Sequence, residues 1–169
     1  MFDKKIGWRF DNTYTKLPES LLFKIKPTPV KKPTLCIFNY DLAKQLNLNF
    51  LDVKNNDIAS IFSGNFLPVG SESIAQAYAG HQFGHFTILG DGRALIIGEH
   101  LTEDEQRFDI QFKGSGKTPY SRSADGRAAL GPMLREYLIS EAMNNLNIKS
   151  SRSLAVVETG ENVFREMEL

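Results

Sequence analysis

The residues of this sequence best suited to chemistry lie in the stretch QFKGSGKTPYSR, residues 111–122. Its Gly-Lys-Thr resembles the end of the phosphate-binding loop of an ATPase, where backbone amides and a lysine hold phosphate oxygens. The full motif requires a glycine five positions before the second one, and Gln111 stands there. Thr118 also precedes Pro119, which disfavours the helix that must begin at this point. The sequence therefore argues against a Walker-type loop.

A second glycine-rich stretch, LGDGRAL at residues 89–95, offers another way to bind a nucleotide. The apolar runs around it predict a hairpin over roughly residues 86–99 that turns at the two glycines. The run FDIQFK alternates apolar and polar side chains as a strand does, and Lys113 is its last residue on the polar face. A helix predicted from Pro132 onward has an apolar stripe through Leu138, and Glu136 lies off that stripe.

Three strands, a helix and two further strands are the order of elements in the small lobe of a protein kinase. In that lobe a glycine-rich hairpin covers the phosphates and a strand lysine pairs with a helix glutamate, places that Lys113 and Glu136 would take. The pairing has a physical reason, because a carboxylate fixes the ammonium group that must hold phosphate oxygens. From pattern alone, the simpler interpretation is that both residues are solvated surface charges. The predicted fold class is α+β: an antiparallel five-stranded sheet with one main helix, preceded by an extended and helical N-terminal region.

The elements that precede this lobe are predicted to be short. Prolines at four of the first 33 positions predict an extended arm that packs Trp8, Phe10, Tyr14 and Phe23 against another part of the protein. Local patterns then predict a strand at 34–38 and helices at 39–48, 57–64 and 71–80.

The end of the sequence is predicted to form a second hairpin over the turn TGEN, within residues 152–166. The expected domains are residues 1–80, an N-terminal arm with short helices, and residues 81–169, a kinase-like lobe with the nucleotide-binding hairpin.

Bulk composition limits the class of protein. The chain has 169 residues, 41% of them hydrophobic, which is enough for one modest core. Twenty Lys and Arg balance twenty Asp and Glu, so neither nucleic acid nor an anionic membrane is expected as a partner. No signal peptide is recognisable, and a cytoplasmic location is expected. The single cysteine, Cys36, lies in an apolar stretch and is expected to be a small buried residue rather than a nucleophile.

Three long blocks in order closely resemble the selenoprotein O family, also called YdiU-like proteins. They are QAYAGHQFGHFTILGDGRALIIGE at 76–99, DIQFKGSGKTPYSR at 109–122, and DGRAALGPMLREYLISEAM at 125–143, the last followed by RSLAVVETGE at 152–161. The similarity runs from about residue 5 to the end. It implies a kinase-like (pseudokinase) fold and a protein adenylyltransferase. Such an enzyme binds ATP in an orientation flipped relative to kinases and transfers AMP to Ser, Thr or Tyr hydroxyls of proteins, releasing pyrophosphate.

The resemblance also implies functional roles for particular residues. Those that match the family's ATP-binding pattern are Gly90, Gly92, Arg93, Lys113, Asp125 and Gly126. Lys113 and Glu136 match the catalytic lysine and the glutamate that positions it. Asp125 is expected to form hydrogen bonds or shape its loop rather than act as a base. Ser123 and Ala124 stand where the family usually has Arg-Gly.

Other parts of the family's site match no residue of this chain. The general base, the Mg²⁺ ligands and two further phosphate-binding arginines are expected beyond residue 169, so no metal ligand is assigned and the C-terminal lobe is expected to be absent. Two functions stay open: an ATP- and Mg²⁺-dependent adenylyltransferase of protein hydroxyl groups to which this chain supplies the small lobe, or a truncated, inactive nucleotide-binding or interaction fragment.

Four further residues have two interpretations each. Lys117 and Arg122 are either an anion-binding patch near the nucleotide or solvated loop residues. His81 and His85 are four positions apart, as in a helical metal site, but the glycines around them favour packing or hydrogen bonding in a loop.

Overall fold

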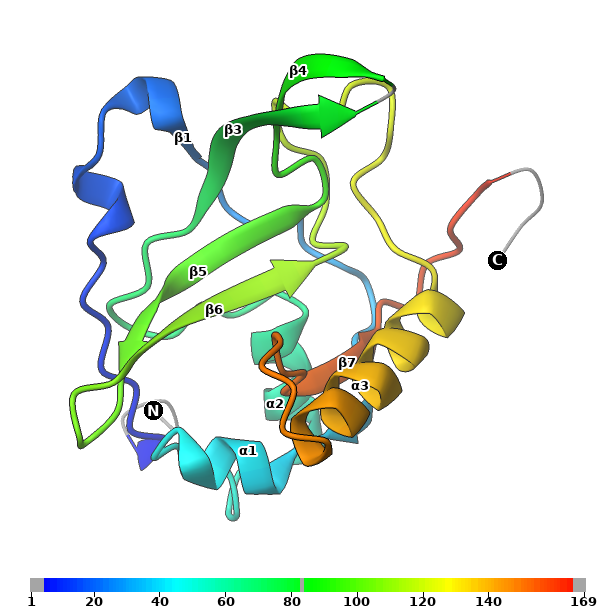
Figure 1. The fold of residues 1–169 in the computed structure, drawn as a ribbon. Helices are drawn as coiled ribbons and strands as arrows, with labels where there is room; N and C mark the ends of the chain where they lie inside the picture. Colours follow the sequence, from blue (N-terminus) through cyan, green and yellow to red (C-terminus); the bar gives the residue numbers. More distant parts are fainter. Residues whose placement is uncertain (1–4, 83, 166–169) are drawn as a thin grey trace. The chain divides into compact units, whose positions relative to one another are not determined.

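The computed structural model of the protein describes residues 5–82 and 84–165 and divides into two compact units. The sheet unit comprises residues 8–28 and 67–127, and the helical unit comprises the described parts of 1–7, 29–66 and 128–169. The units are interleaved in sequence, as the chain colours of Figure 1 allow the reader to follow. The predicted division into residues 1–80 and 81–169 stays a prediction.

The sheet unit is built on one antiparallel sheet of five strands: β1 (Leu22–Lys24), β3 (Ile74–Gln82), β4 (His85–Gly90), β5 (Ala94–Leu101) and β6 (Arg107–Lys113). The strand order is β1-β3-β5-β6, with β4 paired to β3 (Figure 1). Leu22, Ile74 and Ile96 form a buried cluster within it. The predicted α+β class with a five-stranded antiparallel sheet is therefore confirmed, whereas its likeness to a kinase lobe stays a prediction.

The hairpin predicted over residues 86–99 is wrong, because the chain does not reverse direction at GDG. β4 and β5 both run antiparallel to β3, with Ala77 opposite Gly90 and Ile74 opposite Ile96. The three residue positions from Ile74 to Ala77 on β3 thus lie opposite the six positions from Gly90 to Ile96. Residues 91–93 have no counterpart on β3 and form a bulge-like kink. The reversal lies instead where β3 ends and β4 begins.

The helix predicted at residues 71–80 is also wrong, since this segment lies mostly in β3. It pairs with β1, β4 and β5, and this tertiary pairing outweighs the helical propensity of its alanines. The strand predicted to end at Lys113 is confirmed as β6: Ile110 and Phe112 are buried and Lys113 is exposed.

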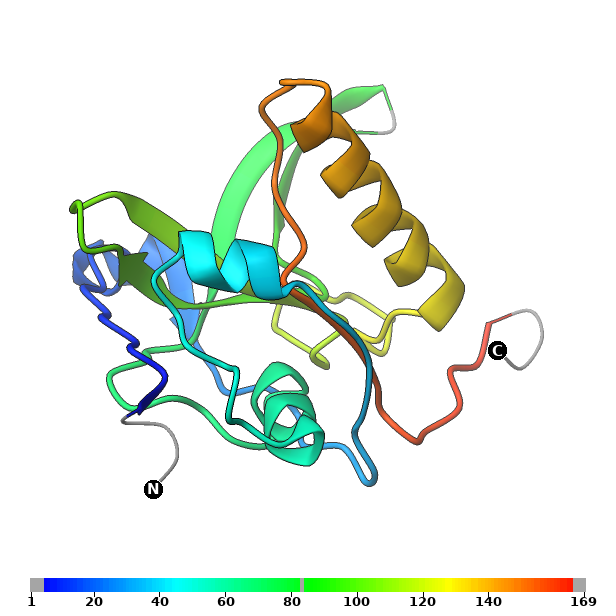
Figure 2. The ribbon, with the colours of Figure 1, turned by 90° about the horizontal axis from the view of Figure 1, so that it is seen from below.

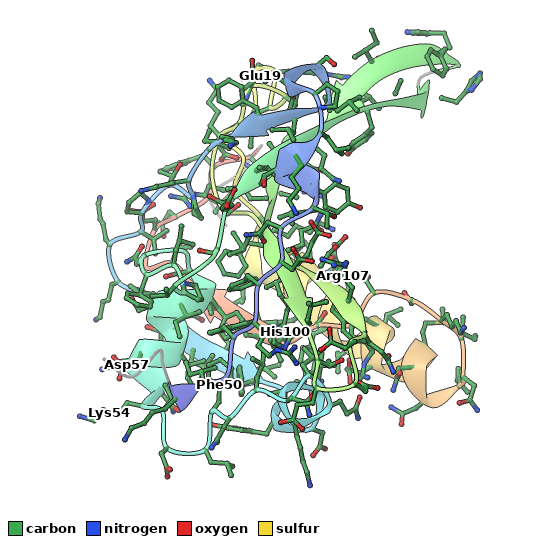
Figure 3. The ribbon with its side chains drawn as sticks, turned by 90° about the vertical axis from the view of Figure 1, so that its left-hand side faces the viewer. Glu19, Phe50, Lys54, Asp57, His100 and Arg107 are labelled. Carbon is green, nitrogen blue, oxygen red and sulfur yellow. The ribbon has the colours of Figure 1, made fainter. Side chains whose placement is uncertain are left out.

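The N-terminal arm, residues 8–16, lies along β5 (Figure 3). Its backbone donates from Asp11 to the Glu99 carbonyl at 2.9 Å. Trp8 stacks on Phe10 with ring centroids 5.3 Å apart, and both rings meet the fully buried His100 edge-on. The arm ends in a short 3₁₀ helix, η2 (Tyr14–Lys16), and a second one, η3 (Glu19–Leu21), follows it. The predicted packing of the arm is confirmed for Trp8, Phe10 and Tyr14, while Phe23 on β1 is 48% exposed.

The helical unit contains α1 (Tyr40–Gln45), α2 (Asn55–Phe62), α3 (Leu130–Asn145) and the antiparallel pair of β2 (Thr34–Phe38) and β7 (Ala155–Glu158) (Figure 2). Asn39 caps α1 as predicted, because its side chain accepts a hydrogen bond from the Leu42 amide at 2.9 Å. The buried Phe50 packs against Phe38 and Phe62, with ring centroids 4.8 and 5.8 Å away.

Two predictions for the last third of the chain need correction. The hairpin expected within residues 152–166 is wrong, because β7 pairs with the distant β2. The long helix is confirmed as α3, but Pro132 is its third residue, and its apolar stripe is not buried: Leu138 is 63% exposed. The helix is held instead by a bidentate ion pair of Glu141 with Arg152.

Cys36 lies on β2 and is exposed, so the expectation that it is buried is wrong. The pKa of its thiol is nevertheless raised, first by partial burial and then by the neighbouring Glu158 carboxylate. A raised pKa favours the unreactive thiol, which agrees with the expectation that it is no nucleophile. None of the helices in the described part of the chain combines the length and apolarity that a membrane span requires.

Candidate functional site

Most of the predicted site residues lie together at one end of the sheet unit. Gly90, Gly92 and Arg93 belong to the segment that joins β4 to β5, which we call the glycine kink (residues 90–93). Lys113 ends β6 opposite Ala94, and the next amide, that of Gly114, donates to the Arg93 carbonyl at 2.7 Å. The chain then forms the exit loop (residues 114–127), which contains the remaining two residues of the predicted ATP site.

Gly90 is required because the exit loop packs directly on it. A Cβ atom at this position would lie 2.6 Å from the Tyr120 ring and 2.8 Å from the Gln76 carbonyl oxygen. At Gly92 the same atom would lie 2.9 Å from the Tyr120 carbonyl oxygen. Since real Cβ atoms do not approach other atoms this closely, only glycine allows the loop to close on the kink.

Two buried hydroxyl groups of the exit loop bond to the kink. Thr118 Oγ1 donates to the Asp91 carbonyl at 2.6 Å, and Ser121 Oγ donates to the Gly92 carbonyl. The Thr118 amide in turn donates to Ser121 Oγ at 2.7 Å. Thr118 is 4% exposed and Ser121 5%. The Gly-Lys-Thr that resembles a phosphate loop thus uses its threonine to hold another backbone segment.

The far end of the exit loop returns to its start. The Gly116 amide donates to the Gly126 carbonyl at 3.2 Å. Gly126 has φ +71°, and a Cβ there would lie 2.6 Å from the Lys117 nitrogen, so both its conformation and its surroundings favour glycine. The Asp125 carboxylate accepts from the Arg127 amide at 2.8 Å, a contact that fits the loop-shaping role expected of Asp125.

Asp91, within the kink, was missed by sequence reasoning. Its side chain is nearly buried and accepts from the Gln76 amide at 2.9 Å, while its own amide donates to the Gln76 carbonyl at 2.9 Å. Burial raises the pKa of Asp91, and the hydrogen bonds from Gln76 and Tyr78 only partly offset this. Burial therefore disfavours the charged form of this carboxyl group.

The exposed Asp125 carboxylate belongs to this end of the sheet unit, as do four exposed cationic side chains. The cations are Arg93 from the kink, Lys113 from β6, and Lys117 and Arg122 from the exit loop. Cations combined with backbone amides are the usual components of a phosphate-binding site. The arrangement is therefore chemically suited to an anion.

Glu136 is exposed on α3, in the helical unit, so its predicted pairing with Lys113 stays a prediction. His81 and His85 lie on paired strands rather than on one helix face. The His81 ring packs against the Phe86 ring, with ring centroids 6.1 Å apart. Within the described residues, no group of three or more His, Cys, Asp or Glu side chains comes together as a metal site.

A cavity of about 610 Å³ lies elsewhere in the sheet unit, between the arm and the paired strands β5 and β6. Its lining includes Glu99 and Arg107, which already bond to each other and to the arm. None of the predicted site residues lines this cavity. We therefore place the candidate site at the glycine kink, where glycines and cations converge, rather than at this cavity.

The chain is thus an α+β protein whose candidate site is a glycine-rich kink with neighbouring cations at the end of an antiparallel sheet. The sequence model of the family described as protein adenylyltransferase SelO matches residues 5–169. The chain therefore belongs to the SelO family.

The chain is similar to proteins of several bacteria that carry the name protein nucleotidyltransferase YdiU. The chain is 59% identical over 173 residues to that of Brevibacillus brevis, covering 100% of this chain and 35% of the relative. It is 65% identical over 161 residues to that of Pelagibacter ubique, a match that covers 95% of this chain and 33% of the relative. It is 62% identical over 169 residues to that of Nitrosococcus oceani, a match that covers 100% of this chain and 34% of the relative. The chain thus spans about a third of the length of these curated relatives.

Proposed function

We propose that this chain forms the ATP-binding, kinase-like small lobe of a protein adenylyltransferase. The reaction transfers AMP from ATP to Ser, Thr or Tyr hydroxyl groups of proteins. The hydroxyl group gives up its proton to a general base, its oxygen forms a bond to the α-phosphorus, the bond from that phosphorus to the oxygen bridging to the β-phosphate breaks, and pyrophosphate leaves. Family membership supports nucleotidyl transfer as the reaction class, since the curated relatives are named protein nucleotidyltransferases.

One observation carries the proposal: the glycine kink, the end of β6 and the exit loop converge in one compact unit. The Gly114 amide ties the loop to Arg93, and the Gly116 amide ties its start to Gly126. All six residues that match the family's ATP pattern therefore belong to one hydrogen-bonded region. Arg93 and Lys113 supply positive charge for the phosphates, and the glycines let the exit loop pack directly on the kink.

The roles of Glu136 and Mg²⁺ are part of the same proposal. Glu136 fixes the ammonium group of Lys113, as the corresponding glutamate does in kinases. The described residues do not fit a metal site, so no residue of this chain is assigned to Mg²⁺ and no step is derived through it. The proposal leaves the metal and the general base to other parts of a protein of the relatives' length.

The test uses a protein of the relatives' length that contains this chain. Incubated with a protein substrate and ATP labelled at the α-phosphate, it is expected to label the substrate, whereas ATP labelled at the γ-phosphate is expected to leave it unlabelled. The Lys113→Ala variant should lose the α-label. Transfer of the γ-label alone would identify a kinase, and no transfer with intact ATP binding would identify a nucleotide-binding module.

A further inference from the structure

We propose that Thr118 and Ser121 are positioning residues for the nucleotide: they hold the glycine kink in the one conformation that turns its backbone amides toward phosphate. The inference rests on the proposed ATP site and deepens it. Neither residue belongs to the family's ATP-binding pattern, and neither side chain is exposed enough to be the main contact of a ligand.

The kink creates a backbone problem that these hydroxyl groups solve. Because residues 91–93 are extra to the register with β3, their carbonyl groups have no partner on that strand. A buried carbonyl without a partner costs about 1–3 kcal/mol. Here all three accept a hydrogen bond from the exit loop: Asp91 from Thr118, Gly92 from Ser121 and Arg93 from the Gly114 amide.

Holding the carbonyls also fixes the amides. In a trans peptide the C=O and the following N–H point in opposite directions, and the chain has no cis peptide among its described residues. With the carbonyls of Asp91 and Gly92 directed at the exit loop, the amides of Gly92 and Arg93 are directed away from it. Successive amides that point the same way form a concave anion-binding group.

The clamp itself is rigid, which a positioning role requires. Ser121 Oγ accepts from the Thr118 amide at 2.7 Å, the Ser121 amide donates to the Thr118 carbonyl at 3.1 Å, and the Tyr120 amide donates to Thr118 Oγ1 at 3.1 Å. Both hydroxyl groups are thereby held in place before they meet the kink. The Tyr120 ring against Gly90 closes the same contact from the other side.

The experiment is calorimetric titration of the 169-residue chain with ATP, run alongside urea unfolding of each variant. Thr118→Val keeps the side-chain shape but removes the hydroxyl donor, and we expect it to bind ATP at least tenfold more weakly than wild type. Thr118→Ser restores the hydroxyl and should bind within about twofold of wild type. Glu99→Gln is the matched control: it weakens the same unit at a distant buried carboxylate and should leave ATP affinity within about twofold, provided that the titration is done where all variants are folded.

If Thr118→Val binds ATP with wild-type affinity, the positioning role is overturned. The proposed function still stands in that case if Lys113→Ala binds ATP more weakly than wild type. A loss in Glu99→Gln equal to that in Thr118→Val also overturns it, because the effect would then be general weakening of the unit. If Thr118→Val does not fold, Ser121→Ala takes its place with the same expectation. Absence of ATP binding by the wild type overturns both the positioning role and the proposed site.

Discussion

Two buried carboxylates of the sheet unit, Glu99 on β5 and Asp91 in the glycine kink, are held in opposite ways. Glu99 is 2% exposed and accepts from the Thr13 amide at 2.5 Å, the Thr13 hydroxyl at 2.6 Å and the Tyr14 amide at 2.8 Å. Arg107 adds a fourth donor at 3.3 Å. Burial raises the pKa of Glu99, but these hydrogen bonds and the arginine charge outweigh it and hold the pKa below its ordinary value. At Asp91 burial prevails and the pKa is raised.

The difference shows how the two ends of the sheet unit are specialised. At Glu99 the donors of the arm and Arg107 satisfy the carboxylate, so this end fixes the N-terminal arm. At the kink the exit loop binds the backbone carbonyls and leaves the cations on the surface. A saturated network stabilises the fold, whereas exposed cations beside backbone amides are the groups that a phosphate site would use.

The substitution Glu99→Gln is expected to have the largest effect and tests the anchoring role of this carboxylate. The amide replaces one acceptor oxygen by an NH₂ group that would face donors, so we expect the free energy of unfolding to fall by about 3 kcal/mol. Urea unfolding measures the change. Glu19→Gln, at the exposed η3 (Figure 3), is the control and should stay within about 0.5 kcal/mol of wild type. A loss below about 1 kcal/mol for Glu99→Gln would contradict the anchoring role.

At the kink, Gly90→Ala tests whether the exit loop packs as tightly as the structure indicates. The new Cβ would overlap the Tyr120 ring, and we expect a loss of about 1–3 kcal/mol in stability together with weaker ATP binding. Gly80→Ala is a matched control in the same strand pair, because no atom lies within 4 Å of its Cβ position. It should be neutral or more stable by up to about 1 kcal/mol. Equal effects of the two substitutions would refute the packing argument.

The opposite pKa shifts predict opposite pH trends. The pKa of Glu99 is lowered, so its stabilisation is present above its unfolded pKa of about 4.3 and is lost as the pH falls through the folded value. The pKa of Asp91 is raised, so its stabilisation is present below its unfolded pKa of about 3.9 and is lost as the pH rises through the folded value.

The stability deficit of Glu99→Gln relative to wild type should therefore shrink as the pH falls below about 4. The stability of Asp91→Asn relative to wild type should instead increase as the pH rises from about 4 to 7. Urea unfolding at several pH values measures both trends. Trends of the same sign would show that the two carboxylates do not differ in the way described.

The smallest effect is expected from the ion pair at the outer edge of the arm. Arg9 and Glu105 meet at 2.7 Å, but their side chains are 47% and 68% exposed. Solvent screening limits such a pair to less than about 0.5 kcal/mol, so Glu105→Gln should hardly change the unfolding midpoint. A loss as large as that of Glu99→Gln would mean that the exposed pair, rather than the buried carboxylate, holds the arm.

Two features could be predicted because their signals are local. β6 follows from the alternation of its side chains, and the cap of α1 follows from Asn39. The strand pairing could not, because GDG carries the local signature of a turn, whereas its actual conformation depends on contacts with Thr118 and Ser121, which are 27 and 29 residues away. The pairing of β7 with β2 likewise joins residues from opposite ends of the chain.

The candidate site divides in the same way. Glycines and lysines in characteristic stretches point to a nucleotide, and the family resemblance assigns them individually. Asp91, Thr118 and Ser121 carry no such signal, because each acts through a backbone partner that only the folded chain brings near. A hydroxyl that satisfies a distant carbonyl looks, in sequence, like any residue of a polar loop.

The central claim is that the end of the sheet unit which carries the glycine kink binds ATP through Lys113. Calorimetric titration of ATP into wild type, Lys113→Ala and the control Lys24→Ala tests it most directly, since Lys24 is an exposed lysine on strand β1 of the same unit. We expect wild type and Lys24→Ala to bind alike and Lys113→Ala to bind at least tenfold more weakly, as loss of a charge-assisted phosphate contact implies. Equal binding by all three proteins would contradict the account.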